Sequence, residues 1–179
     1  IPVFVLIRPR SGNFVYTEEE FDIIKQDIQL CKSLGCSGIV SGILSNDNTI
    51  DIERTKELVE LSKPLQFTFH RAFDCVKNPF EALDQLIGLG VDRVLTSGLE
   101  TSAEKGLNLL KQLHKQANCR ITILAGSDIN PKNAKLFIDV GLNEIHASAS
   151  SKIEIDSSLF STPLTYSDPK KIKAILDAI

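Results

Sequence analysis

The sequence predicts an α/β fold, namely a (β/α)8 TIM barrel of which the 179 residues supply about six βα units. Short runs rich in Val, Ile, Leu and Phe alternate with longer helical patterns from end to end, an order typical of parallel sheets covered by helices. The runs begin about 28 residues apart, so eight units need about 224 residues, within the usual range of such barrels. An open doubly wound sheet could also be completed by six units. It typically carries a Gly-rich phosphate turn after its first strand, whereas residues 8–12 read Arg-Pro-Arg-Ser-Gly. The barrel is therefore favoured.

The composition fits one globular domain over residues 1–179. The chain has 42% hydrophobic residues, 20 Lys and Arg, and 23 Asp and Glu. Its net charge of −3 argues against a nucleic-acid partner, because such partners are bound through an excess of cationic side chains. No apolar run approaches the ~20 residues of a membrane span, so we expect no membrane partner. The chain begins at Ile1 and contains no Met, which indicates an N-terminally truncated barrel that lacks its first two units.

The six expected strands are compact apolar runs, as parallel strands covered on both faces require. They are residues 2–8, 37–42, 65–70, 91–97, 120–126 and 142–148.

Helix starts and stops can be predicted between these strands. Two pairs have the spacing of a capping box, Thr17 with Glu20 and Thr101 with Glu104. Three cap residues precede a proline at the first helical position, namely Asn78, Asn130 and Asp168. Three glycines stand just before strands, where a helix stop is expected, namely Gly35, Gly90 and Gly141.

Residues 149–168 form the longest stretch without a helical pattern, and they are rich in Ser and Thr. An irregular segment of this length inside a compact domain is usually functional or mobile. We therefore expect a mobile loop here, and it is a candidate lid.

Polar side chains collect where the strands end, which is where parallel α/β folds carry their reactive groups. His70 and Arg71 end the third strand, and Asp74 follows closely. A histidine beside these two charges could act as a general acid or base, so His70 and Asp74 are the candidate catalytic pair. The alternative is that Asp74 only pairs with Arg71 and that His70 is a wall residue.

Two arginines flank Pro9 at the end of the first strand, and alternation would place Arg8 and Arg10 on the same side. Guanidinium groups at a barrel mouth suit a carboxylate or phosphate. Other strand ends supply the remaining candidates for binding such an anion, namely Arg71, Ser97, Gly98, Gly126 and His146. The alternatives are a structural ion pair for Arg8 and ordinary turn chemistry for the glycines.

The four cysteines are too few for a disulfide scaffold in a chain of this length, which points to a reducing compartment. Cys31 and Cys36 are expected to be small buried apolar residues. Cys75 lies five residues after His70, near the predicted mouth, and its thiolate would suit Cu(I). Cys75 is therefore the candidate metal ligand.

Four segments, residues 4–16, 68–74, 93–98 and 144–149, resemble the CutC copper-homeostasis family, and the match runs from residue 1 to about 150. The resemblance implies a (β/α)8 barrel whose third to eighth units correspond to this chain. It also implies a cytoplasmic protein that can occur in the nucleus, forms homo-oligomers and is linked to copper tolerance and Cu(I). The family's copper-linked cysteines belong to early strands that this chain lacks. Family members often read Phe-His-Cys-Ser-Ala on the last strand, where residues 145–149 here read Ile-His-Ala-Ser-Ala.

Three hypotheses follow for function. The first is a copper homeostasis protein that binds Cu(I) without turnover. The second is an uncharacterised barrel enzyme in which Arg8, Arg10 and Gly126 hold a small anionic substrate while His70 and Asp74 move a proton. The third is an oligomeric scaffold whose barrel mouth is vestigial.

Overall fold

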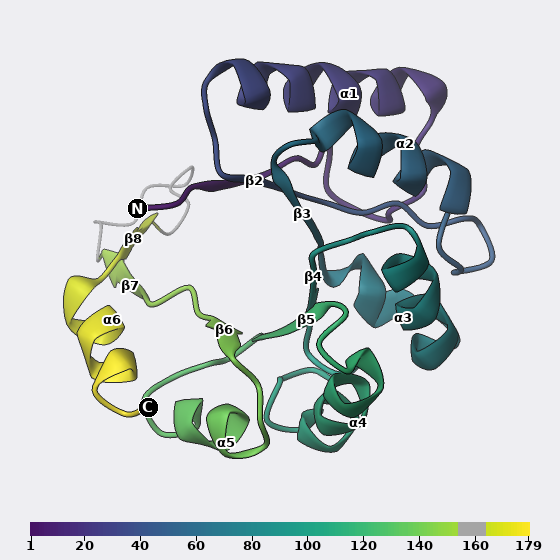
Figure 1. Ribbon diagram of the computed structural model, residues 1–179. Helices are drawn as coiled ribbons and strands as arrows, with labels where there is room; N and C mark the ends of the chain where they lie inside the picture. The colour runs from purple at the N-terminus through teal and green to yellow at the C-terminus, as the bar shows by residue number, and fades with distance from the viewer. Residues whose placement is uncertain (154–163) are drawn as a thin grey trace.

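A six-stranded parallel sheet forms the centre of the computed structural model, which describes residues 1–153 and 164–179. Its strands are β1 (Phe4–Leu6), β2 (Gly38–Ser41), β3 (Gln66–Phe69), β4 (Arg93–Thr96), β5 (Thr122–Gly126) and β6 (Glu144–His146). Each strand pairs in parallel with its neighbours in the sequence. The strands curve around an open centre with the helices outside (Figure 1). All six predicted strands are confirmed.

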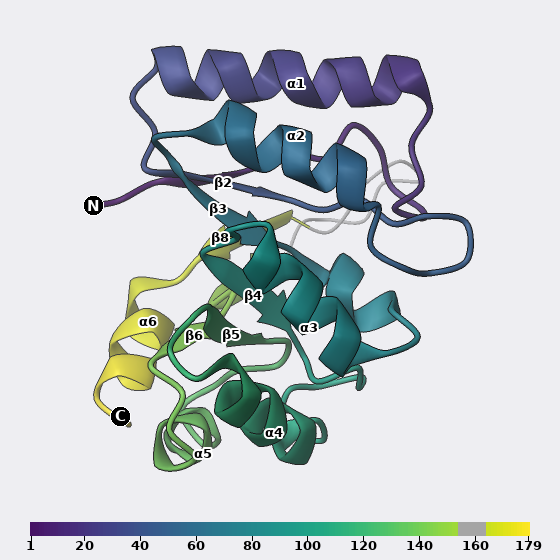
Figure 2. The same cartoon turned by 45° about the vertical axis from the view of Figure 1, so that its right-hand side comes forward.

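This arrangement decides between the two architectures. A doubly wound sheet reverses its strand order and carries helices on both faces. Here the order follows the chain, and Figures 1 and 2 both show α1–α5 on the outer face of the curved sheet. The fold is therefore a partial (β/α)8 barrel.

The helices are α1 (Glu18–Ser33), α2 (Ile52–Ser62), a 3₁₀ turn η1 (Arg71–Cys75), α3 (Pro79–Gly88), α4 (Leu107–Ala117), α5 (Ala134–Asp139) and α6 (Pro169–Leu176). The predicted capping box of α1 is confirmed. Thr17 Oγ1 accepts from Glu20 N at 3.3 Å, and Glu20 Oε2 accepts from Thr17 N at 2.9 Å. Asn78 and Asp168 likewise cap α3 and α6. The three stop glycines have φ of +73°, +77° and +98°, as a left-handed helix stop requires.

Two predicted helix starts are wrong. The Thr101–Glu104 pair forms no capping box, because α4 begins later, at Leu107. The Glu104 carboxylate instead accepts from Asn133 Nδ2 at 3.2 Å. Asn130 caps a turn, where its Oδ1 accepts from Lys132 N at 2.9 Å, and α5 begins only at Ala134.

The core lies between the sheet and the helices. Alternate strand residues point outward beneath the helices, and four of them, Ile39, Phe67, Val94 and Ile123, are at most 1% exposed. α1 contributes the buried stripe Phe21, Ile24, Ile28 and Cys31. Burial of each such side chain stabilises the fold by about 1.5–3 kcal/mol. The opposite residues of the strands face the barrel interior, where the polar groups of interest lie.

The prediction of an irregular loop over residues 149–168 is wrong at both ends of that segment. β7 (Ser150–Ile153) and β8 (Leu164–Ser167) pair antiparallel, with Ser150 opposite Ser167. In Figure 1 this small sheet and α6 occupy the side of the ring between β6 and the N-terminus. The predicted mobility of the middle of the segment falls on residues outside the described ones. Within the described part of the chain, no helix has the length and hydropathy needed to span a bilayer.

Candidate functional site

The inner face of the curved sheet borders a cavity of about 580 Å³. Its polar lining at the C-terminal ends of the strands comprises Arg8, His70, Arg71 and His146. A second cavity of about 850 Å³ adjoins it and shares Arg71, Leu95 and His146. Arg71 and His146 therefore lie at the boundary between the two cavities, at the end of the barrel where parallel α/β folds carry their chemistry.

At the N-terminal ends of the strands, an ion pair that the sequence did not predict lines the same cavity. Arg93 Nε donates to Glu144 Oε2 at 2.6 Å, and Arg93 Nη1 donates to Gln66 Oε1 at 2.8 Å. The guanidinium lies 4.9 Å above the Phe4 ring. The sequence offered one signal for this ion pair, since the first residues of β4 and β6 carry opposite charges and both lie on the inward face. Because these groups satisfy one another, we place the chemistry at the other end.

His70 is a buried histidine whose two ring nitrogens differ. His70 is the residue directly after β3, and it is 4% exposed. Nδ1 accepts a hydrogen bond from Ala72 N at 3.2 Å, and the Phe14 ring packs 4.9 Å away. Burial, assisted by the nearby Arg8 charge, lowers the pKa of His70 to about 4. The ring is therefore neutral at pH 7, and its proton resides on Nε2 because Nδ1 is an acceptor.

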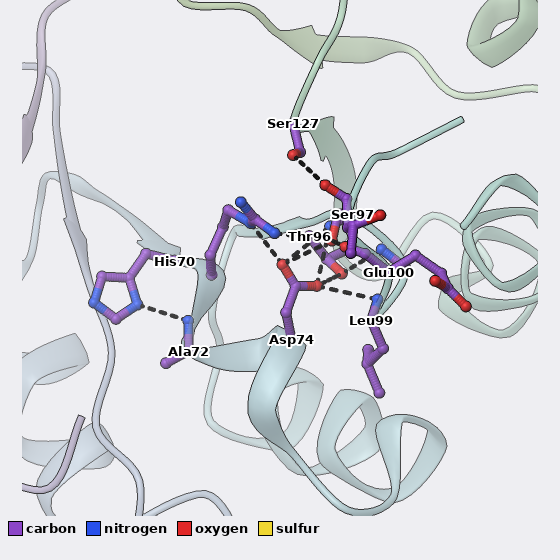
Figure 3. A network of polar contacts seen from close by, with 11 residues as sticks. His70, Ala72, Asp74, Thr96, Ser97, Leu99, Glu100 and Ser127 are labelled. Atoms are coloured by element: carbon purple, nitrogen blue, oxygen red, sulfur yellow. Dashed lines mark hydrogen bonds and ion pairs between the residues drawn. The ribbon is translucent and has the colours of Figure 1, made fainter. Parts of the chain in front are cut away.

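Asp74 is surrounded by donors (Figure 3). Its carboxylate accepts from Arg71 Nε at 2.7 Å, Thr96 Oγ1 at 2.5 Å, Ser97 N at 3.0 Å and Leu99 N at 3.3 Å. These bonds tie η1 to the end of β4. Among the described residues no hydrogen bond joins Asp74 to the His70 ring, which Figure 3 shows on the other side of η1. The structure thus separates the two predicted catalytic groups, and the acid–base role stays a prediction.

Arg71 is held at the cavity boundary by this network. Its Nε pairs with Asp74, and its Nη2 donates to Ser97 Oγ at 3.0 Å. Ser97, which accepts this hydrogen bond, is fully buried. The Gly98 N–H donates to Thr96 Oγ1 at 2.9 Å, so it serves the turn itself. Of these three candidates for anion binding, Arg71 borders the cavities and the other two support the loop beside it.

Arg8 and Arg10 do not point to the same side, contrary to expectation. Arg8 lines the cavity, and its guanidinium lies 4.5 Å above the Phe14 ring. Arg10 turns back into the loop after β1, where it donates to Glu20 Oε1 at 2.5 Å and to Val15 O at 2.6 Å. Loop carbonyls and a helix carboxylate therefore occupy the donors of Arg10, and a single arginine from this loop reaches the cavity.

The three other candidates lie in different settings. His146 ends β6 and lines both cavities, and partial burial lowers its pKa. Gly126 gives room to the interior, because a Cβ there would lie 2.6 Å from Leu95 Cδ1. Cys75 is exposed on η1, away from both cavity linings. Within residues 1–153 and 164–179, no three His, Cys, Asp or Glu side chains gather as metal ligands would.

Comparison with known proteins identifies the family. A family model described as the CutC family matches residues 1–151. The chain belongs to the CutC family. A mouse relative named copper homeostasis protein cutC homolog is 49% identical over 152 residues, which cover 84% of this chain and 56% of that protein. A CutC protein of Photorhabdus laumondii is 47% identical over 150 residues, or 84% of this chain and 60% of the relative.

A solved CutC structure supports the fold. The crystal structure of CutC from Streptococcus agalactiae aligns with a TM-score of 0.78 at 34% identity, covering 82% of this chain and 72% of that one. This chain spans 56–62% of the length of the curated CutC relatives it matches.

Proposed function

We propose that the protein acts in copper homeostasis. The observation that carries this proposal is its similarity to the mouse relative of that name, 49% identical across 84% of the chain. At this level of identity the fold is retained, so the relative's role is the first function to test.

A growth assay tests the proposed role. Cells that lack their own CutC are expected to tolerate less copper, and expression of this protein is expected to restore growth on copper medium. Growth on zinc medium is the control, because a general stress effect would alter both. Unchanged copper tolerance on expression would contradict the proposal.

We propose Cu(I) as cargo of the protein rather than as a resident catalytic metal. Cys75 supports this as a candidate ligand, because its thiol is exposed and soft thiolates favour Cu(I). The described residues provide no cluster of three ligating side chains, so Cys75 would bind with few partners.

A competition titration with a Cu(I)-specific chelator tests the thiol. The variant C75S is expected to lose Cu(I) binding, whereas C119S, which removes another exposed cysteine, is expected to retain it. Equal binding by both variants and the unaltered protein would exclude Cys75 as a ligand.

We further propose a cytoplasmic protein, also present in the nucleus, that forms homo-oligomers. The four cysteines, none in a disulfide, support a reducing compartment. Fluorescence microscopy of the tagged protein tests the location, and light scattering of the purified protein tests its assembly. An exclusively secreted protein or a strictly monomeric one would contradict the respective proposal.

A second candidate function is a barrel enzyme that acts on a small anionic substrate. It is favoured by the cavity at the strand ends, which carries Arg8, His70 and Arg71 together. In this hypothesis His70 and Asp74 transfer the proton. Of the remaining anion-binding candidates, His146 lines the same cavity, Ser97 and Gly98 support the loop beside it, and Gly126 lies next to Leu95 of its lining.

Solvent-proton exchange tests that enzymatic role. Small carboxylates and phosphate esters are incubated with the protein in D₂O, and loss of their C–H signals is followed by NMR. Exchange that disappears in H70Q and D74N would support the acid–base pair. Absence of exchange for the whole panel would count against this second function.

A further inference from the structure

A buried hydrogen-bond donor lies in the cavity wall. His70 is 4% exposed, and its Nε2 atom is buried without a hydrogen bond within the described part of the chain. Since Nδ1 accepts from Ala72 N, the neutral ring carries its proton on this unpartnered nitrogen. Buried polar groups in proteins are nearly always paired, because an unpaired one costs free energy. An acceptor atom of a ligand in the cavity would satisfy this Nε2–H group.

The neighbours of His70 fix the orientation of its ring. Ala72 N holds one edge, and the Phe14 ring packs against the face. Gly42 makes room on the β2 side, since a Cβ there would lie 2.7 Å from Nδ1. A ring held on three sides presents its second nitrogen in one direction, which is the preorganisation that a ligand donor needs.

Cationic groups accompany this donor in the same cavity. Arg8 and Arg71 both line it with His70. The charge of Arg71 is matched by Asp74, at 2.7 Å. For Arg8, no carboxylate of the described residues lies within ion-pair distance, so the cavity mouth carries an excess of positive charge. A hydrogen-bond donor beside excess positive charge selects for an anionic oxygen.

We propose that the cavity mouth binds an oxyanion of the carboxylate or phosphate class, with His70 as a neutral hydrogen-bond donor through Nε2–H and with Asp74 as a positioning residue that holds Arg71. This inference rests on the second candidate function, whose anion site it specifies. It replaces the acid–base roles of both residues. A neutral donor stabilises charge on a ligand oxygen without losing its proton, and a carboxylate that accepts from five donors keeps a guanidinium in place.

Sulfate is the probe, because it remains a dianion over the whole range from about pH 5.5 to pH 8 in which an ordinary histidine titrates. Its dissociation constant is measured by calorimetry for the unaltered protein and for H70F, H70Q and D74N. H114Q is the matched control on α4, outside the cavity linings. H146Q controls for the other histidine of the cavity. The charged groups around His70 are Arg8 and Arg71 of the cavity lining and Asp74, which pairs with Arg71.

The expected results are specific to a neutral donor. Sulfate affinity stays constant from about pH 5.5 to pH 8, and H70F weakens it by about 10- to 100-fold. H70Q, whose amide N–H replaces the donor, retains most of the affinity, and D74N weakens binding while D74E restores part of it. H114Q binds as the unaltered protein does, and the constant profile persists in H146Q. Thermal unfolding midpoints verify that each variant is folded.

Three outcomes would overturn the inference. Equal sulfate binding by H70F and the unaltered protein would remove His70 from the site but leave an anion site in place. Affinity that rises about tenfold per pH unit below about pH 6.5, and does so in H146Q as well, would show that the imidazolium binds the anion. No sulfate binding by the unaltered protein would overturn both this inference and the second candidate function.

Discussion

Two charged residues at the strand ends, Arg10 and Asp74, use their hydrogen-bonding capacity inside loops. Arg10 donates to Glu20 and to three carbonyl groups of its own loop, those of Ser11, Asn13 and Val15. Asp74 accepts from η1 and from the end of β4. A charged side chain whose partners are all protein groups shapes the site without touching a ligand. At the scale of single residues, such groups contribute directly to stability and only indirectly to ligand binding.

Replacing Asp74 is expected to destabilise the fold. D74N keeps the size of the side chain, but its amide leaves several donors without an acceptor, including the buried Thr96 hydroxyl. We expect a loss of about 2–4 kcal/mol in the free energy of unfolding, measured by urea titration. D139N, which removes an exposed carboxylate paired with Lys135, is the control and should change stability by less than about 0.5 kcal/mol. Equal effects of the two variants would contradict the structural role of Asp74.

The buried His70 is expected to make stability depend on pH. The folded state holds its pKa near 4, below the unfolded value of 6.5, so the unfolded chain binds more protons between these values. Stability should therefore fall as pH decreases from 6.5 towards 4, by about 3 kcal/mol in total from this group. Urea unfolding across that interval measures the loss. In H70Q this part of the pH dependence should disappear, and an unchanged profile would show that His70 is not buried and neutral.

The expectation that polar side chains gather at the C-terminal ends of parallel strands identified several cavity residues correctly. It did not predict where the side chains of the other candidates point. Arg8, His70, Arg71 and His146 all line the cavity, because the C-terminal ends of parallel strands meet there. β1 ends at Leu6, so alternation no longer applies at Arg10, whose side chain turns into the loop. Its partners are carbonyl groups of an irregular loop, which no periodic pattern in the sequence reveals.

At the scale of elements, α4 begins where the chain packs against the loop after β4. Among the residues that the structure describes, no side chain caps this helix. Gly106 packs directly on the loop after β4, where a Cβ on Gly106 would lie 1.9 Å from Ser97 O. The predicted capping box at Thr101 failed because local spacing cannot report such a contact between backbones. The start of α1, whose partners lie within one turn, was predictable for the opposite reason.

Substitution of Gly106 is expected to disturb this junction strongly. A methyl group in G106A would meet backbone atoms that cannot move aside, so we expect a loss of at least about 3 kcal/mol in unfolding free energy. G88A is the matched control, since a Cβ on that exposed residue of α3 meets no described atom within 4 Å. It should be neutral or stabilise by up to about 1 kcal/mol. Chemical denaturation compares the two, and a stable G106A protein would contradict the contact.

At the scale of the whole molecule, the described sheet has two edge strands. β1 pairs with β2 and β6 pairs with β5, and within the described residues neither edge has a second partner. Leu6 in β1 is 61% exposed, whereas Thr68, which lines the same cavity from β3, is 2% exposed. The inner strands β2–β5 are therefore better shielded from solvent than the edge strands β1 and β6.

Amide hydrogen exchange should report this gradient. We expect the slowest exchange in β2–β5, at residues such as Ile39 and Val94, and faster exchange in β1 and β6. Mass spectrometry of peptic fragments of the purified 179-residue chain measures the rates. Protection of β1 equal to that of β3 would show that another segment or another copy covers the edge.

The sequential strand order also bears on how the chain folds. Paired residues in neighbouring strands are separated by 20 to 34 positions, so every strand pairing closes a loop of similar, moderate length. Moderate separations between contacts favour faster folding than the long separations of Greek-key sheets. As the chain leaves the ribosome, each new strand meets a neighbour that has already been synthesised. The sheet can therefore be assembled in the order of synthesis, from one end of the curved sheet to the other.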